Sequence, residues 1–151
     1  MITIIEGVDG TGKTTYAKRL AEQNNATYLH ADKPTHSKWY EEYLKPINNT
    51  NMVLDRWHLG ELVWPIIYDR PSLFDAESFD ICNWAFAKMG TRLIIMTRSD
   101  DDIANELLSR GEDDQIEQVL HAKELFMQAY KEVKYIDKQI IESGVVHVPS
   151  N

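Results

Sequence analysis

The stretch ITIIEGVDGTGKTTYAKRL, residues 2–20, decides which fold this chain is expected to adopt. It begins with a β-branched apolar run at 2–5, which is typical of a buried parallel strand. Apolar residues recur at helical spacing in YAKRLA, residues 16–21. Between them, residues 7–14 carry the spacing Gly-x4-Gly-Lys-Thr, the phosphate-binding P-loop pattern, which needs a strand before it and a helix after it. The sequence therefore predicts a nucleotide phosphate site at the start of the first helix.

The alternative is a glycine-rich turn that only joins a strand to a helix, and chance would produce the full pattern in roughly one such chain in a few hundred. The residues predicted to hold the phosphates are Gly7, Gly10, Thr11, Gly12, Lys13, Thr14 and Thr15. In such a loop the Lys13 ammonium reaches the β- and γ-phosphates, and the Thr14 hydroxyl ligates Mg²⁺.

Composition narrows the class of protein. The 151 residues suffice for one domain, with 43% hydrophobic and 26% charged residues. The net charge of −8 and the absence of a Lys/Arg run argue against a nucleic-acid polymer as partner. No stretch is long enough to span a membrane, and the N-terminal apolar run is too short for a signal peptide, so we expect a cytoplasmic protein. The single cysteine, Cys82, excludes an internal disulfide and is expected to be a buried small hydrophobe.

Strand and helix patterns alternate along the chain without a hairpin signal. Strands are predicted at 2–6, 26–31, 51–57, 91–97 and 145–149. Helices are predicted after Lys13, at 38–47, from 59 to a stop at Pro65 or Pro71, at 75–90, at 99–110, and at 114–143 as one long helix or two closely joined ones. The chain 1–151 is thus expected to form one α/β domain, a five-stranded parallel sheet with helices on both faces.

Two of these helices carry start signals. Asp75 is a predicted N-cap for 75–90, and Ser99 for 99–110. The three carboxylates at 100–102 are expected to complement the dipole of that helix rather than to bind a metal.

In parallel α/β sheets, ligands bind beyond the carboxyl ends of the strands, so the charged residues there are candidates for the site. Asp55 follows an apolar strand and is expected to position Mg²⁺, partly through water, together with Thr14. Arg56 suits a bidentate grip on phosphate. Arg110 precedes Gly111, which permits a hinge, and spacing alone leaves a mobile phosphate-binding arginine and a surface charge equally open.

Three motifs give the sequence a resemblance to the thymidylate kinases: EGVDGTGKTT (6–15), DRW (55–57) and SRGED (109–113). The segment 55–70, DRWHLGELVWPIIYDR, is similar to short, virus-type members. The resemblance implies the three-layer P-loop kinase fold and transfer of the γ-phosphoryl of ATP, with Mg²⁺, to a nucleoside monophosphate, foremost dTMP. It also implies cytoplasmic activity (host cytoplasm for a viral protein) and a homodimer formed through the helix that carries Trp84 and Phe86.

Residue roles follow from the resemblance. The P-loop has no arginine, so the lid around 109–117 is expected to supply one, Arg110. The predicted catalytic residues are Lys13, Asp55, Arg56 and Arg110. The predicted acceptor-binding residues are Asp9, Lys33, Arg56, Trp57, Glu61, Trp64, Tyr68 and Arg70. Of these, Trp57, Trp64 and Tyr68 are named for their residue type, as flat apolar surfaces for the base, and the alternative is that they form the core of an amphipathic helix. The chain has Asp32-Lys33-Pro34 where the family usually has Arg-Glu-Pro, so Lys33 replaces the usual arginine as the cation there.

Two other functions remain open. A nucleoside kinase would share this fold but act on a neutral hydroxyl, and such kinases tend to place a glutamate where this chain has Asp55, to accept the hydroxyl proton. The aspartate therefore favours a monophosphate acceptor. The third candidate is a nucleotide-binding regulatory module without transferase activity, which would have no need of Arg56.

Overall fold

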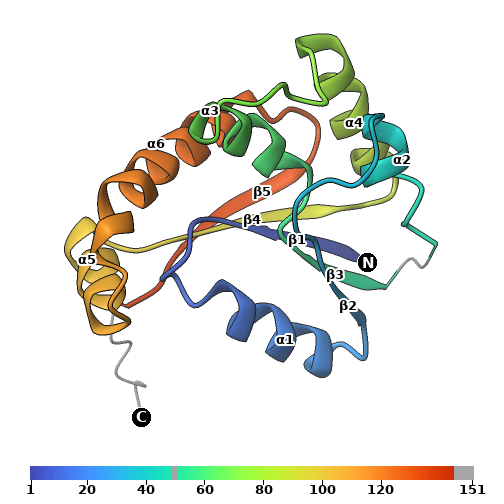
Figure 1. The fold of residues 1–151 in the computed structure, drawn as a ribbon. Coiled ribbons are helices and arrows are strands. Elements are labelled where there is room, and N and C mark those ends of the chain that lie inside the picture. The colour runs from blue at the N-terminus through green and yellow to red at the C-terminus, as the bar shows by residue number, and fades with distance from the viewer. Residues whose placement is uncertain (49–50, 145–151) are drawn as a thin grey trace.

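The computed structural model describes residues 1–48 and 51–144. Its centre is one sheet of five parallel strands in the order β2-β3-β1-β4-β5 (Figure 1). The strands are β1 (Ile2–Glu6), β2 (Thr27–His30), β3 (Met52–Asp55), β4 (Arg92–Thr97) and β5 (Asp137–Glu142). In the central strand, Ile4 pairs with Leu54 of β3 and Leu93 of β4. The α/β class and the parallel sheet predicted from the sequence are confirmed.

Helices cover both faces of the sheet, which gives three layers (Figure 1). The helices are α1 (Lys13–Gln23), α2 (Trp39–Tyr43), α3 (Trp64–Ile67), α4 (Ala76–Lys88), α5 (Asp100–Ser109) and α6 (Ile116–Glu132), with 3-10 helices η1 (His58–Leu62) and η2 (Asp113–Gln115). On one face, α1 buries a small core that includes Ala17, Ile5 and Ile94. The larger core lies under α3, α4 and α6 and includes Phe86 and Phe126.

The predicted helix starts are confirmed. The Asp75 carboxylate accepts a hydrogen bond from Ser78 N, and Ser78 Oγ accepts one from Asp75 N, which completes a capping box at α4. Ser99 Oγ accepts from Asp102 N at the start of α5.

The described ranges contain no cluster of three His, Cys, Asp or Glu side chains that could hold a metal ion. Cys82 is fully buried in α4, as expected.

The helix predicted over 114–143 is wrong in its second half, because the fifth strand of the sheet lies at Asp137–Glu142. The apolar residues 133, 136 and 140 match helical spacing, but α6 ends at Glu132, and the chain turns through Tyr135 with φ 75°. As an edge strand, β5 pairs with β4 alone among the described strands and stays largely exposed, so it lacks the apolar run that marks the central strands. The strand predicted at 145–149 lies outside the described residues.

Proline had a different effect from the one predicted between 59 and 71. Pro65 does not stop a helix but occupies the first turn of α3, where its missing N–H removes no helical hydrogen bond. The helix predicted at 38–47 is also shorter, reduced to α2.

Of the helices in the described ranges, none is long and apolar enough to cross a membrane.

Candidate functional site

The P-loop runs from β1 to α1 across the carboxyl edge of the sheet. Gly7 has φ 140°, and a Cβ there would lie 2.3 Å from the carbonyl oxygen of Met96 on β4, so no side chain fits. Gly12 has φ 77° and is the residue before α1, where the left-handed conformation favours glycine. Lys13 and Thr14 therefore lie at the N-terminus of a helix, as a phosphate site requires. Thr15, in the same first turn, is exposed.

Two residues that follow other strands of the sheet donate hydrogen bonds to backbone carbonyls of the P-loop. Arg98, just after β4, donates from Nη1 to the Gly10 carbonyl at 2.9 Å. Ser143, just after β5, donates from Oγ to the Thr11 carbonyl at 2.6 Å. Thr11 itself donates to the Val8 carbonyl at 2.9 Å, so the loop is braced both internally and from the sheet. These hydrogen bonds fix the backbone conformation of the loop without any bound ligand.

Asp55, at the end of β3, is fully buried and faces the start of α1. Its Oδ2 accepts hydrogen bonds from Thr14 Oγ1 at 2.9 Å and from the Tyr28 hydroxyl at 2.6 Å, and it lies 3.1 Å from His30 Nδ1. Burial alone would raise the pKa of Asp55, but the bonds from Tyr28 and His30 and the charge of Lys13 lower it. Asp55 is therefore held as a carboxylate.

These residues fit a magnesium ion. Asp55 Oδ1 is buried and has no hydrogen-bond partner within the described part of the chain. It therefore remains free to accept a metal-bound water or to ligate a metal. Mg²⁺ prefers oxygen ligands and is usually held by one or two protein groups together with water and substrate phosphates. A hydroxyl and a carboxylate in direct contact, Thr14 and Asp55, offer that type of site.

Glu6, the last residue of β1, ties the P-loop strand to the segment after β3. Its side chain is fully buried, and Oε1 accepts from the backbone N–H of Trp57 at 2.7 Å and of Leu59 at 3.1 Å, and more weakly of Gly60 at 3.4 Å. Burial raises the pKa of Glu6 to about 8, against the lowering effect of these backbone donors. By holding the backbone that directly follows Arg56, the Glu6 carboxyl group fixes the position of Arg56 in the site.

Arg56 and Lys13 meet at one carboxylate. Arg56 Nη2 donates to Asp9 Oδ1, and Lys13 Nζ lies 3.9 Å from the same oxygen. Arg56 has φ 63°, a left-handed conformation that is costly for a residue with a side chain and is concentrated at functional sites. Lys13 is buried, and burial lowers its pKa. Two cations that the sequence predicts to bind phosphate, one from the P-loop and one from the segment after β3, therefore converge on Asp9.

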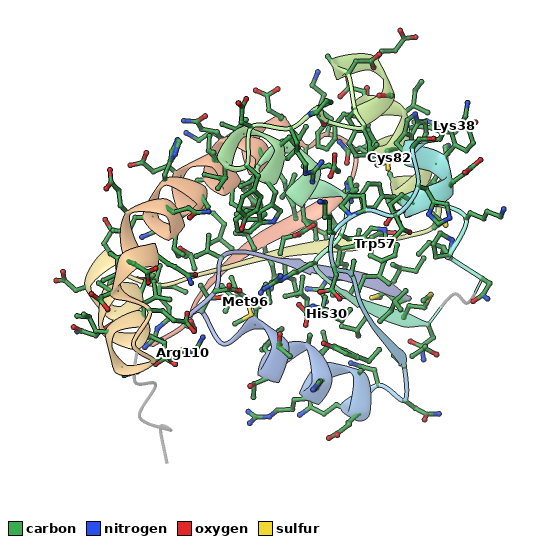
Figure 2. All side chains as sticks on the ribbon, in the orientation of Figure 1. His30, Lys38, Trp57, Cys82, Met96 and Arg110 are labelled. Atoms are coloured by element: carbon green, nitrogen blue, oxygen red, sulfur yellow. The ribbon has the colours of Figure 1, made fainter. Side chains whose placement is uncertain are left out.

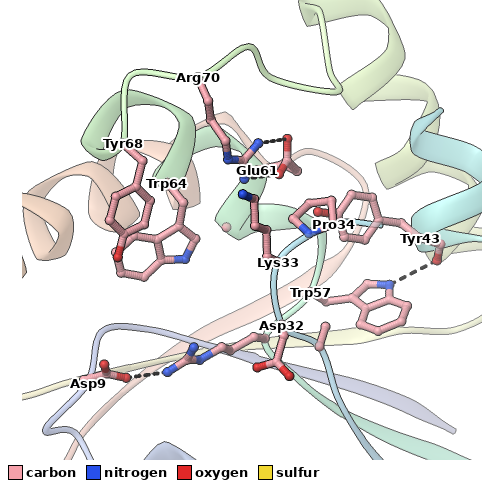
Figure 3. A pocket seen from close by; sticks show the side chains of 13 residues that line it. Asp9, Asp32, Lys33, Pro34, Tyr43, Trp57, Glu61, Trp64, Tyr68 and Arg70 are labelled. Atoms are coloured by element: carbon pink, nitrogen blue, oxygen red, sulfur yellow. Dashed lines mark hydrogen bonds and ion pairs between the residues drawn. The ribbon is translucent and has the colours of Figure 1, made fainter. Parts of the chain in front are cut away.

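A cavity of about 490 Å³ opens beside this pair. Figure 3 shows Asp9, the partner of Arg56, at one end, the Glu61–Arg70 pair at the other, and aromatic side chains along the walls. All eight residues predicted to bind the acceptor line it: Asp9, Lys33, Arg56, Trp57, Glu61, Trp64, Tyr68 and Arg70. The volume is in the range typical of small-molecule sites. The sequence therefore predicted the lining of this cavity, although binding itself stays a prediction.

The aromatic residues divide between wall and core. Trp57 is 5% exposed and donates from Nε1 to the Tyr43 carbonyl at 3.0 Å, so most of its ring belongs to the core. Trp64 and Tyr68 stack with ring centroids 5.8 Å apart, and Tyr68 is 61% exposed. They form the wall on one side of the cavity, while Pro34 and Tyr43 lie on the other (Figure 3). A planar base could lie between the two walls.

Arg110 lies apart from this cavity. It follows α5 (Figure 2). Its Nη2 donates to Glu106 Oε1 at 2.9 Å. Glu106 in turn flanks the P-loop, because a Cβ on Gly10 would lie 3.7 Å from its Cγ. Gly111, where the hinge is predicted, has φ 70°. The structure thus places the predicted lid arginine near the donor loop, and its role in transfer stays a prediction.

Sequence reasoning gave no role to several residues of the site: Glu6, Tyr28, His30, Tyr43, Arg98 and Ser143. Their partners are far away in sequence, so no local motif marks them. The position of Arg98 just after a strand was a usable signal, since ligands bind at that edge. Ser143 could not be found, because its segment matched a helix.

No protein-family model and no curated protein sequence matches this chain. Its structure is similar to that of the YorR protein of Bacillus subtilis, solved in complex with phosphorylated GDP, with TM-score 0.83 and 19% identity, over 96% of this chain and 87% of that one. It is also similar to deoxyadenosine kinase from M. mycoides. With the products dCMP and dCDP bound, that structure has TM-score 0.60 and 14% identity, over 93% of this chain and 89% of that one. With dCTP bound, it has TM-score 0.59 and 17% identity, over 94% and 90%. At these identities the likeness shows the fold, which is that of P-loop nucleotide kinases.

Proposed function

We propose that this protein is a phosphotransferase that moves the γ-phosphoryl group of ATP to a nucleoside monophosphate. The observation that carries the proposal is the meeting of Lys13, from the donor loop, and Arg56, from the acceptor cavity, on the single oxygen Asp9 Oδ1. An acceptor phosphate would replace Asp9 as the partner of Arg56 and would then lie next to the donor phosphates. The thymidylate kinase resemblance makes dTMP the first acceptor to test.

The chemistry proposed is positioning and charge compensation. The P-loop N–H groups and Lys13 hold the donor phosphates, and Arg56 holds the acceptor phosphate in line with them. Bound Mg²⁺, held by Thr14 and Asp55, would neutralise charge on the donor phosphates. The acceptor phosphate is already ionised at neutral pH, so the site needs no general base. We expect this activity in the cytoplasm, where both nucleotides are present.

A second candidate, a deoxynucleoside kinase, is supported by the structural likeness to deoxyadenosine kinase. It would place a neutral hydroxyl, not a phosphate, beside the donor. Two features support the monophosphate instead: the pKa of Asp55 is lowered, which makes this carboxylate a weak base for a substrate hydroxyl, and Arg56 lines the cavity.

The variant Arg56→Ala tests the proposal. We expect it to raise the KM for the monophosphate and to lower kcat by about tenfold or more, because a charge-assisted phosphate contact is lost. Arg19→Ala is the matched control, since Arg19 is an exposed arginine of α1 that does not line the cavity. Steady-state ADP formation measures both parameters. Unchanged monophosphate kinetics in Arg56→Ala would remove the proposed acceptor site.

A further inference from the structure

The end of the cavity away from Arg56 carries a buried ion pair. Arg70 Nη2 donates to Glu61 Oε1 at 2.6 Å, and Arg70 Nη1 donates to Glu61 Oε2 at 3.3 Å. The backbone N–H of Leu73 adds a third bond to Glu61 Oε2, at 2.9 Å. This network fixes the plane of the guanidinium group at the end of the cavity (Figure 3).

The two partners differ in what they can offer a ligand. The Glu61 side chain is 1% exposed and is engaged on both oxygens, so it has no accessible acceptor left. The Arg70 side chain is 23% exposed. A guanidinium group has five N–H donors and no acceptor. Arg70 uses three of them, two to Glu61 and one to the Pro71 carbonyl, so within the described ranges two N–H donors remain.

The other polar groups of the lining do not change this balance. Lys33 is a cation with donors only. The Tyr43 and Tyr68 hydroxyls can each donate and accept, so neither discriminates. The exposed carboxylates, Asp9 and Asp32, lie at the Arg56 end of the cavity (Figure 3). The base end is therefore rich in donors and poor in acceptors.

We propose that the Glu61–Arg70 pair selects acceptor nucleotides whose base carries a carbonyl at C6 of a purine or C4 of a pyrimidine (guanine, hypoxanthine, thymine or uracil) over adenine and cytosine, which carry an amino group there. A nucleotide held by its phosphate at Arg56 extends its base along the cavity between the aromatic walls towards Arg70. A carbonyl oxygen accepts from the free N–H groups, whereas the exocyclic amino group of adenine or cytosine presents a donor to a donor. The base edge, not its size, is what this end of the cavity distinguishes.

This inference rests on the proposed function, and substrates matched in size test it. The pairs dUMP with dCMP, and dIMP with dAMP, differ at the ring by a carbonyl in place of an amino group. For the wild-type enzyme with Mg·ATP, we expect kcat/KM to favour the carbonyl member of each pair about five- to a hundredfold. Calorimetric dissociation constants of the same monophosphates should show the same order.

The double variant Glu61→Gln/Arg70→Gln provides the second arm. It replaces the ion pair by two amides that can still bond to each other, and an amide offers the base both a donor and an acceptor. We expect the preference within each pair to fall to within about threefold, while a thermal melt confirms folding. Arg19→Gln, the exposed control, should keep the wild-type ratio.

The outcomes separate the two proposals. Turnover that is equal within each pair, or that favours dCMP and dAMP, overturns the base selection and leaves the kinase intact. Absence of turnover with every monophosphate overturns the kinase, and binding that still prefers dUMP and dIMP would then support the base selection alone. Binding of neither member of either pair overturns the base selection as well.

Discussion

The imidazole of His58 lies wholly inside the core, between η1 and α4. Its Nε2 is 2.8 Å from Asn83 Oδ1, and its ring stacks on Phe86 with centroids 4.9 Å apart. Its Nδ1 is buried without a hydrogen-bond partner in the ranges that the structure describes. Burial lowers the pKa of His58 to about 4, because a charged ring cannot be solvated there.

Acid should therefore destabilise the protein through this residue. The folded-state pKa lies below the unfolded value of about 6.5, so the contribution of His58 to stability is complete above pH 6.5 and is lost as the pH falls towards 4. The full loss amounts to about 3 kcal/mol. Urea denaturation of the wild type between pH 7 and pH 4 should show this decline, and His58→Gln should flatten it. His121→Gln, at an exposed histidine, should leave the decline unchanged; equal slopes in the wild type and His58→Gln would contradict the assignment.

A site residue could be predicted from the sequence where its neighbours along the chain mark its role. The P-loop motif occupies eight consecutive residues, 7–14, and Asp55 and Arg56 stand where an apolar strand ends abruptly. Glu6 and Arg98 also stand at the ends of apolar strands, but no nearby residue marks their roles, because their hydrogen-bond partners belong to loops 50 or more residues away. Their positions at strand ends are visible in the sequence, but only the strand order brings each of them to its partner.

Among the elements, α5 and the turn after it are the segment expected to move. Arg110 pairs with Glu106, an exposed contact four residues away on the same helix, and such pairs are weak. Little energy therefore opposes rotation of Arg110 towards the donor phosphates about the turn at Gly111. The predicted lid function requires that movement.

Two variants of this element test the lid. Arg110→Ala should lower kcat by at least about a hundredfold with a small change in acceptor KM, because an arginine acts on the transferring phosphoryl group mainly in the transition state. Glu106→Gln removes only the resting partner of Arg110 and should keep kcat close to the wild-type value. Pre-steady-state phosphoryl transfer measures the effect on the chemical step. A full kcat in Arg110→Ala would exclude the lid arginine.

The elements themselves were predictable where they are buried. The three inner strands, β1, β3 and β4, contain apolar runs because helices cover them on both faces, whereas the edge strand β2 is only partly buried. The edge strand β5 is mostly exposed, and its two isoleucines, Ile140 and Ile141, adjoin instead of alternating. Its place in the sheet is set by pairing with Arg92–Thr97, a long-range contact that no local pattern encodes.

For the molecule as a whole, nucleotide binding should be linked to stability. A ligand that binds only the folded state at a hundred times its Kd adds about 2.7 kcal/mol to the free energy of unfolding. Mg·ATP should therefore raise the Tm by several degrees, and the shift should shrink when EDTA removes Mg²⁺. Lys13→Met should lose most of it. The same shift in Lys13→Met as in the wild type would contradict phosphate binding at the P-loop.

The helix α4 bears on the predicted homodimer. Trp84 is 54% exposed, and Lys88 lies over its ring, whereas Phe86 is fully buried in the core. Of the two residues that the family resemblance named, only Trp84 is therefore at the surface. Dimerisation stays a prediction, which sedimentation of the wild type and of Trp84→Ala would test.

The proposed function requires that a second phosphate is brought to meet the donor, and the dependence of ADP formation on the acceptor tests this. The protein with Mg·ATP is given dTMP, thymidine or no acceptor, alongside the other monophosphates, and ADP formation is followed. The proposed function predicts turnover that depends on a monophosphate and little with thymidine. Turnover with thymidine but with no monophosphate would contradict it and identify a nucleoside kinase. ADP formation that no acceptor accelerates would leave a nucleotide-binding module.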